Sequence, residues 1–146
     1  MGDLTQECAS RWEHFAHGAD IGVRGIGATK EIAFEQAALS LTAVVTDPAR
    51  VVARRKVDVQ CEAENRETLL VDWLNALIYE MAVRRMIFRR FEVHIEGDRL
   101  QGSAWGEDID VARHEPAVEV KGATYTSLRV GRNEAGEWIA QCVVDV

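Results

Sequence analysis

The sequence predicts an α+β fold in a single domain, with a mostly antiparallel sheet and two helices packed on one face. Two segments carry apolar residues at helical spacing, and most of the others alternate apolar and polar residues with a period of two. The alternating segments cluster after the second helix, whereas a parallel α/β fold would interleave strands and helices. A length of 146 residues corresponds to one domain over residues 1–146, with residues 1–10 as a candidate flexible N-terminal extension.

Two short strands, over residues 11–16 and 21–26, are expected before the first helix. That helix is expected over residues 29–45, with Thr29 as the N-cap, because a threonine hydroxyl can accept from the free amides of the first turn. The helix should end before Pro48, since a residue that precedes proline is disfavoured in the helical conformation.

The second helix has the clearest amphipathic pattern in the chain and is expected over residues 66–81. Its apolar face is formed by Leu70, Trp73, Leu74, Leu77, Ile78 and Met81. We expect Trp73 and Leu74 to lie in the core, and Asp72 and Asn75 to be either helix-surface residues or partner contacts. The alternating segments expected as strands lie over residues 57–63, 91–96, 99–105, 123–130 and 137–144. Residues 108–115 are expected to form a polar loop or a single helical turn.

Composition excludes several classes of protein. A net charge of −7 argues against a protein whose whole surface binds nucleic acid, although a local basic patch stays open. The cysteines Cys8, Cys61 and Cys142 form no C-x-x-C pair, which indicates a reducing cytoplasm and no disulfide framework. No apolar run approaches the roughly 18 residues of a membrane-spanning helix, so no membrane contact is expected.

Basic residues are paired at Arg84-Arg85 and at Arg89-Arg90, and a third run is Arg54-Arg55-Lys56. One interpretation is a solvated rim in which cations complement the end of the second helix. The other is contact with an acidic partner or with RNA phosphates. The sequence leaves both interpretations open.

Three carboxylate groups are candidates for a hard-cation site. Asp20 begins an expected strand beside small residues, Asp145 is penultimate, and Val146 supplies the α-carboxylate. Oxygen ligands of this kind suit Ca²⁺ or Mg²⁺. A lone aspartate at a strand start is also a common turn or cap residue, so the site depends on whether the fold brings these groups together. The sequence has no G-x-S-x-G elbow, P-loop or zinc-deaminase signature, which favours a binding or regulatory module over an enzyme.

Five sequence blocks together resemble the archease family. Residues 17–22 are similar to its H-T-A-D-I-G motif, and residues 69–75 to its L-L-V-D-W-L-N motif. Residues 106–114 are similar to G-E-x-x-D-x-x-R-H, residues 121–125 to K-A-x-T-Y, and residues 143–146 to the closing aspartate and valine. The blocks occur in the family's order, so the resemblance covers the chain from about residue 12 to residue 146. Two positions depart from the pattern: Gly18 replaces a threonine, and Thr126 stands where the family often has histidine.

The resemblance implies a non-enzymatic activator of an RtcB-type RNA ligase, which promotes guanylylation and multiple turnover of that ligase in tRNA splicing and RNA repair. By position, Asp20, Asp145 and Val146 match the family's metal-binding residues, and Lys121 matches a lysine implicated in activation. Ca²⁺ is the metal expected first, with Mg²⁺ or Mn²⁺ as alternatives. The resemblance and the acidic composition together imply a cytoplasmic protein whose partner is the ligase, with no direct binding of nucleic acid.

Two other functions stay open at this point. A metal-dependent hydrolase would use Asp20 and Asp145 as ligands, and a chaperone-like interaction module would need neither. His17 could orient the carboxylate of Asp20 or be purely structural, and His114 is expected to be a hydrogen-bonding loop residue.

Overall fold

The structure, a computed structural model, describes residues 9–146 of the chain. Cys8 therefore lies outside the described residues, and so do residues 1–8 of the expected flexible extension. The elements are β1 (Arg11–His17), β2 (Asp20–Gly27), α1 (Lys30–Val45), the short 3-10 helix η2 (Pro48–Arg50), β3 (Arg55–Glu62), α2 (Arg66–Arg84), β4 (Met86–Glu96), β5 (Arg99–Asp108), α3 (Val111–His114), β6 (Gly122–Ala123), β7 (Arg129–Arg132) and β8 (Trp138–Asp145). Over residues 9–146, no helix is long and apolar enough to cross a membrane.

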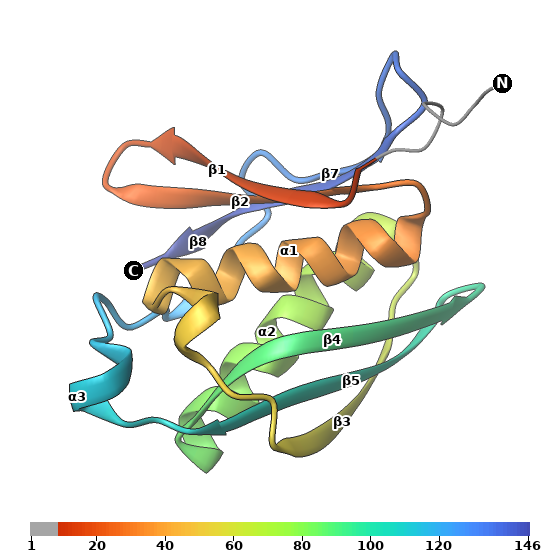
Figure 1. Cartoon of the computed structure of the whole chain (residues 1–146). Coiled ribbons are helices and arrows are strands. Elements are labelled where there is room, and N and C mark those ends of the chain that lie inside the picture. Colours follow the sequence, from red (N-terminus) through yellow and green to blue (C-terminus); the bar gives the residue numbers. More distant parts are fainter. Residues whose placement is uncertain (1–8) are drawn as a thin grey trace, which may run out of the picture.

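The predicted α+β fold with antiparallel strands is confirmed, but the strands form two sheets where one was expected. The first has the order β1-β2-β8-β6, with β7 also paired to β8, and the second has the order β3-β5-β4. Every pairing is antiparallel. Helices α1 and α2 each contact strands of both sheets, so they fill the space between the sheets (Figure 1).

Helix α1 shows why two sheets are needed to cover it. Nine of its sixteen residues are buried and they surround most of the helix, which is the pattern of a helix covered on more than one side. The buried Ser40 accepts from the amide of Arg24 at 3.3 Å and so faces the first sheet. The buried Thr42 donates to the carbonyl of Phe88 at 2.8 Å and so faces the second sheet.

Several predicted boundaries change in the structure. The expected cap is present, since Thr29 Oγ1 accepts from the amide of Ile32 at 3.1 Å. Helix α2 continues to Arg84, and β4 begins five residues before the expected strand because residues 86–88 are buried apolar residues without alternation. The expected strand over residues 123–130 is instead the short β6 and β7, separated by a turn in which Ser127 has a φ of 53°.

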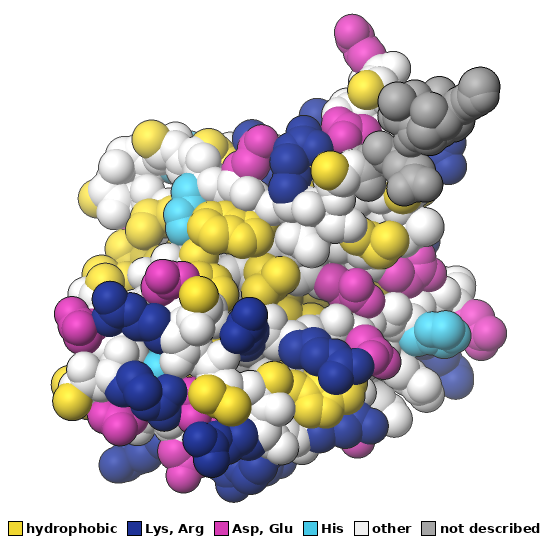
Figure 2. Space-filling view, in the orientation of Figure 1, with side chains coloured by type: hydrophobic (Ala, Val, Ile, Leu, Met, Phe, Trp, Pro, Cys, Tyr) yellow, Lys and Arg dark blue, Asp and Glu magenta, His cyan; other side chains and the backbone are white. Residues whose placement is uncertain are grey.

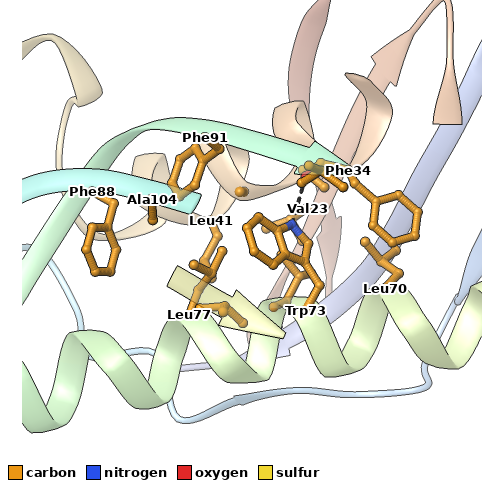
Figure 3. Close-up of a cluster of buried hydrophobic side chains, with 14 of the residues drawn as sticks. Val23, Phe34, Leu41, Leu70, Trp73, Leu77, Phe88, Phe91 and Ala104 are labelled. Carbon is orange, nitrogen blue, oxygen red and sulfur yellow. Dashed lines mark hydrogen bonds between the residues drawn. The ribbon is translucent and has the colours of Figure 1, made fainter. Parts of the chain in front are cut away.

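Trp73 is the centre of the core between the sheets, as predicted from the α2 pattern. Its side chain is fully buried, and its Nε1 donates to the carbonyl of Phe34 on α1 at 3.1 Å (Figure 3). Its ring meets that of Phe91 on β4 edge-on, with 6.2 Å between the centroids. The six-membered ring of the indole lies so close to Gly102 on β5 that an added Cβ would be 2.3 Å from it. One side chain therefore joins α2 to α1 and to the second sheet.

The contact between Trp73 and Gly102 predicts the effect of a single methyl group. Gly102→Ala should lower the free energy of unfolding by about 2 kcal/mol, because the indole cannot move without disturbing four elements. Urea unfolding followed by tryptophan fluorescence measures the change. Gly131→Ala is the matched control, since the nearest atom to its added Cβ is the flexible guanidinium of Arg66 at 3.8 Å. Equal stability of the two variants would contradict the prediction.

Candidate functional site

The pairing of β2 with β8 brings the predicted metal ligands together. Ile21 pairs with Val144, so Asp20, just before it, and Asp145, just after it, lie at the same end of the two strands. The amide of Val146 donates to Oδ1 of Asp20 at 3.4 Å, across 126 positions of sequence. Figure 1 shows the end of β8 beside the turn that joins β1 to β2.

Lys121 reaches the same place through β6. Its amide donates to the carbonyl of Asp145 at 2.8 Å, and the next two residues continue the pairing, Gly122 with Asp145 and Ala123 with Val144. The side chain of Lys121 is exposed. The structure thus gathers Asp20, Lys121, Asp145 and Val146 at one end of the first sheet; we call these four residues the tip.

Asn75 on α2 is exposed at the helix surface and holds β6 in position. Its Oδ1 accepts from the amide of Ala123 at 2.8 Å, and its Nδ2 donates to the carbonyl of the same residue at 3.3 Å. The side-chain amide therefore makes the two hydrogen bonds that a neighbouring strand would make. Asn75 fixes the backbone two residues after Lys121, so it supports the tip from the helix side.

The turn before Asp20 consists of Gly18 and Ala19, because His17 pairs with Asp20 across it. Gly18 has a φ of +60°, a conformation that glycine adopts without strain, and nothing lies within 4 Å of the position of an added Cβ. A residue with a side chain would thus be strained at this position, although its Cβ would meet no neighbouring atom. No hydrogen bond joins the side chain of His17 to that of Asp20 in the part of the chain that is described.

The donor set of the tip consists of carboxylate oxygens. Asp145 is exposed, whereas Asp20 and Val146 are partly exposed. No cluster of three or more histidine, cysteine, aspartate or glutamate side chains within residues 9–146 is arranged to hold a metal. The tip offers the side-chain carboxylates of Asp20 and Asp145 beside Val146, and carboxylates are hard oxygen donors of the kind that Ca²⁺, Mg²⁺ and Mn²⁺ accept.

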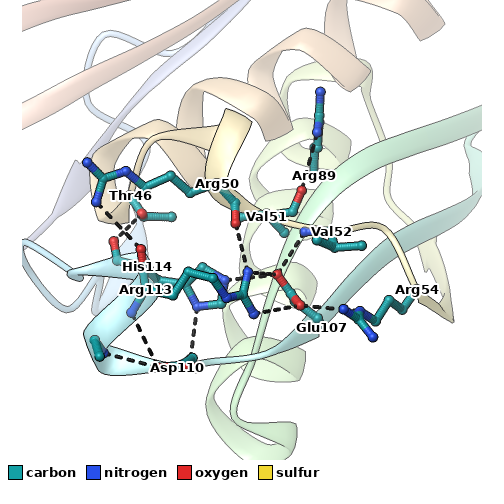
Figure 4. A network of polar contacts seen from close by, with 11 residues as sticks. Thr46, Arg50, Val51, Val52, Arg54, Arg89, Glu107, Asp110, Arg113 and His114 are labelled. Carbon is teal, nitrogen blue, oxygen red and sulfur yellow. Dashed lines mark hydrogen bonds and ion pairs between the residues drawn. The ribbon is translucent and has the colours of Figure 1, made fainter.

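A second polar cluster, built on Glu107, lies between β3, β5 and α3 (Figure 4). The Glu107 side chain is only 6% exposed and receives two hydrogen bonds from the guanidinium of Arg113, at 2.7 and 2.9 Å. The amide of Val52 adds a third at 2.8 Å. These donors, the arginine above all, hold the pKa of the Glu107 carboxyl far below its usual range against the opposing effect of burial.

His114 completes the cluster as the neutral imidazole. Its Nδ1 accepts from the amide of Asp110 at 2.9 Å, so the proton must be on Nε2, which then donates to Glu107 at 3.0 Å. The side chain of Asp110 caps α3 by accepting from the amides of Ala112 and Arg113. Both nitrogens of His114 are thus used within the loop, as expected for a hydrogen-bonding residue and not for a metal ligand.

The model of the archease protein family matches residues 12–146. This chain belongs to the archease family. It is 39% identical to the archease of Pyrococcus furiosus over 140 residues, which cover 93% of this chain and 99% of that protein. It is 42% identical to the archease of Thermococcus gammatolerans, with the same coverage of both proteins.

Two solved structures share the archease fold. The solution structure of Methanobacterium thermoautotrophicum protein 1598 matches with a TM-score of 0.80 and 33% identity, over 92% of this chain and 98% of that one. The crystal structure of an archease from Thermotoga maritima, named a possible chaperone, matches with a TM-score of 0.57 and 19% identity, over 90% and 94% of the two chains. The latter likeness concerns the fold alone.

The Glu107 cluster predicts how the stability of this archease depends on pH. A carboxylate with a lowered folded pKa stabilises the fold above its unfolded pKa of about 4.3, and this contribution is lost as the pH falls toward the folded value. Glu107→Gln should lower the free energy of unfolding by about 1–2 kcal/mol at neutral pH. Urea unfolding at a series of pH values should show the two proteins converging below pH ~4. A difference that does not change with pH would contradict the assignment.

The two hydrogen bonds between Asn75 and Ala123 predict that a substitution of Asn75 destabilises the backbone at the tip. Asn75→Ala should lower the free energy of unfolding by about 1 kcal/mol, because two hydrogen bonds to Ala123 are removed. Amide hydrogen exchange should also become faster at Ala123 and Lys121 than at residues of β3. Asp72→Ala, three residues earlier on the same helix, is the control. An unchanged exchange rate at Ala123 in the Asn75 variant would show that these two hydrogen bonds do not hold β6 in place.

Proposed function

We propose that the chain is a non-enzymatic activator of an RtcB-type RNA ligase, which acts in the cytoplasm and promotes ligase guanylylation and multiple turnover in tRNA splicing and RNA repair. The observation that carries the proposal is the convergence of Asp20, Lys121, Asp145 and Val146 at the tip, from three separate segments of the chain. Membership of the archease family supports the same function.

The tip has the chemistry for an activator that contacts a phosphate-bearing active site. We propose that Asp20, Asp145 and the Val146 carboxylate hold a divalent cation, Ca²⁺ first and Mg²⁺ or Mn²⁺ as alternatives. When bound, the cation would supply positive charge for phosphate oxygens. Oδ1 of Asp20 accepts from the amide of Val146, and this bond turns the carboxylate toward the end of β8. Lys121, whose backbone is fixed by Asp145, adds a second positive charge beside these groups.

One observation favours a second candidate, a chaperone-like module that binds apolar segments. An apolar groove of about 640 Å³ lies between the end of α2, α3 and residues 116–120. Its wall includes Val111, which is 70% exposed, and the exposed Ile109 and Val118. Exposed apolar residues around a groove are typical of a protein-binding surface. This function would not require the carboxylates of the tip.

The ligase proposal predicts that activation depends on the tip. A purified RtcB-type ligase with GTP should be guanylylated faster and turn over repeatedly when the wild-type chain is added. Asp20→Asn, and separately a short peptide extension after Val146, should remove most of this stimulation and weaken Ca²⁺ binding, measured by calorimetry, by at least about tenfold. Asp98→Asn, in the exposed turn between β4 and β5, is the matched control.

The outcomes separate the candidate functions. Stimulation that survives Asp20→Asn, or that is absent in the wild type, would contradict the proposed mechanism. Suppression of aggregation by the wild type and by Asp20→Asn alike, and its loss in Val111→Asp, would favour the chaperone-like function. Phosphatase or nuclease activity of the chain alone, abolished by a chelator, would indicate a hydrolase instead.

A further inference from the structure

Basic side chains gather on one surface of this acidic protein. They come from η2, the following loop and β3, from β4, and from α3, and they are Arg50, Arg54, Arg55, Lys56, Arg89, Arg90 and Arg113; we call this set the basic surface. Figure 2 shows dark blue side chains gathered in the lower part of the view, over the end of the second sheet and α3. Six of these seven cations form ion pairs in the described part of the chain, and they share five carboxylates, those of Asp58, Glu92, Glu107, Asp108 and Glu115.

A β-bulge in β4 turns two consecutive arginines outward. Phe88 pairs with Gly106 and Arg90 pairs with Trp105, so Arg89 has no partner in the ladder. Both arginines are exposed as a result, although successive residues of a regular strand point to opposite faces. Gly106 permits the close approach of β4, because an added Cβ would lie 1.9 Å from the carbonyl oxygen of Ile87.

Trp105 holds two of the cations in a row across the second sheet. Lys56 on β3 and Arg90 on β4 are its cross-strand neighbours on either side. The guanidinium carbon of Arg90 lies 4.4 Å from the indole centroid, and the Lys56 ammonium lies 5.7 Å from it. These cation–π contacts restrict both long side chains while leaving their charged ends at the surface, so less entropy is lost when an anion binds.

The buried carboxylate of Glu107 positions two further arginines with a single negative charge. Arg113 donates to both carboxylate oxygens of Glu107, and Nε of Arg54 lies 3.5 Å from Oε1 of Glu107. The Arg54 side chain is still 67% exposed. Arg89 donates to the carbonyl of Val51 at 3.3 Å and contacts no carboxylate in the described part of the chain. Positive charge therefore remains available on this surface after every ion pair is formed.

We propose that the basic surface binds the phosphate backbone of a nucleic acid. The net charge of −7 belongs to the whole chain and does not describe this surface, where the seven cations lie beside six carboxylates, the five that are ion-paired and that of Asp110. Exposed arginines and lysines on neighbouring strands match a ligand that carries regularly spaced phosphates. The aromatic ring at the centre, Trp105, is flanked by Arg90 and Lys56, so the surface presents charge and not the apolar anchor that a protein interface needs. The proposal is independent of the metal chemistry of the tip.

Fluorescence anisotropy with a labelled single-stranded RNA, over a series of salt concentrations, tests the proposal. The wild-type chain should bind at low salt, with an affinity that falls linearly on a log–log plot against salt. The double variant Arg55→Gln/Arg90→Gln should bind the RNA about tenfold more weakly at low salt. The slope of log affinity against log salt concentration should become shallower by about 1.4, which is about 0.7 for each of the two phosphates that the variant no longer neutralises. The matched control is Arg99→Gln/Arg129→Gln, which removes the same charge from exposed residues outside the basic surface and should bind as the wild type does.

Further measurements distinguish RNA from DNA as the ligand, and two results would overturn the proposal. Equal binding of a DNA duplex would support recognition of the backbone alone, and a preference for the RNA would support RNA as the ligand. Absence of binding to either nucleic acid at low salt would overturn the proposal in favour of an acidic protein partner. Equal weakening by the control variant would overturn it as well, because the binding would then reflect net charge. Circular dichroism of both double variants verifies that they are folded.

Discussion

The antiparallel pairing of β2 with β8 is the contact on which the rest of this structure depends. It joins the second strand of the chain to the last one and makes them the middle of the first sheet, with β1 on one side and β6 and β7 on the other. The face of this sheet that carries Val23 and Cys142 is buried against α1, so a slip of one residue would expose the apolar side chains. The same register places Asp20 next to Val146, and the tip thus follows from packing in the core.

The residues that resemble the family motifs divide into two places in the molecule. Four of the five blocks meet at or beside the tip, where they supply the turn before Asp20, the clamp by Asn75, the backbone of Lys121 and the end of β8. The remaining block, over residues 106–114, builds the Glu107 cluster near α3. Its histidine uses both ring nitrogens within the loop, so this block determines local structure. It also fixes the direction of the arginines around it.

Charge is distributed unevenly over the molecule. The proposed metal site depends on negative side chains, and the proposed binding of nucleic acid depends on positive ones. The tip offers carboxylates to a cation, whereas the basic surface offers guanidinium and ammonium groups to anions. The buried Glu107 lets two arginines lie close together beside a single carboxylate, and the bulge at Arg89 adds two more on the neighbouring strand.

Local patterns in the sequence determined the α+β class, the cap at Thr29, the buried face of α2 and the core position of Trp73, because each depends on residues a few positions apart. The residue types also identified Asp20, Asp145 and Val146 as candidate ligands, and the resemblance added Lys121. Tertiary structure alone decided that the strands form two sheets, that Asn75 pairs with Ala123, and that the arginines form one surface. These features join segments tens of residues apart, and periodicity along the chain identifies an inward face without identifying what it packs against.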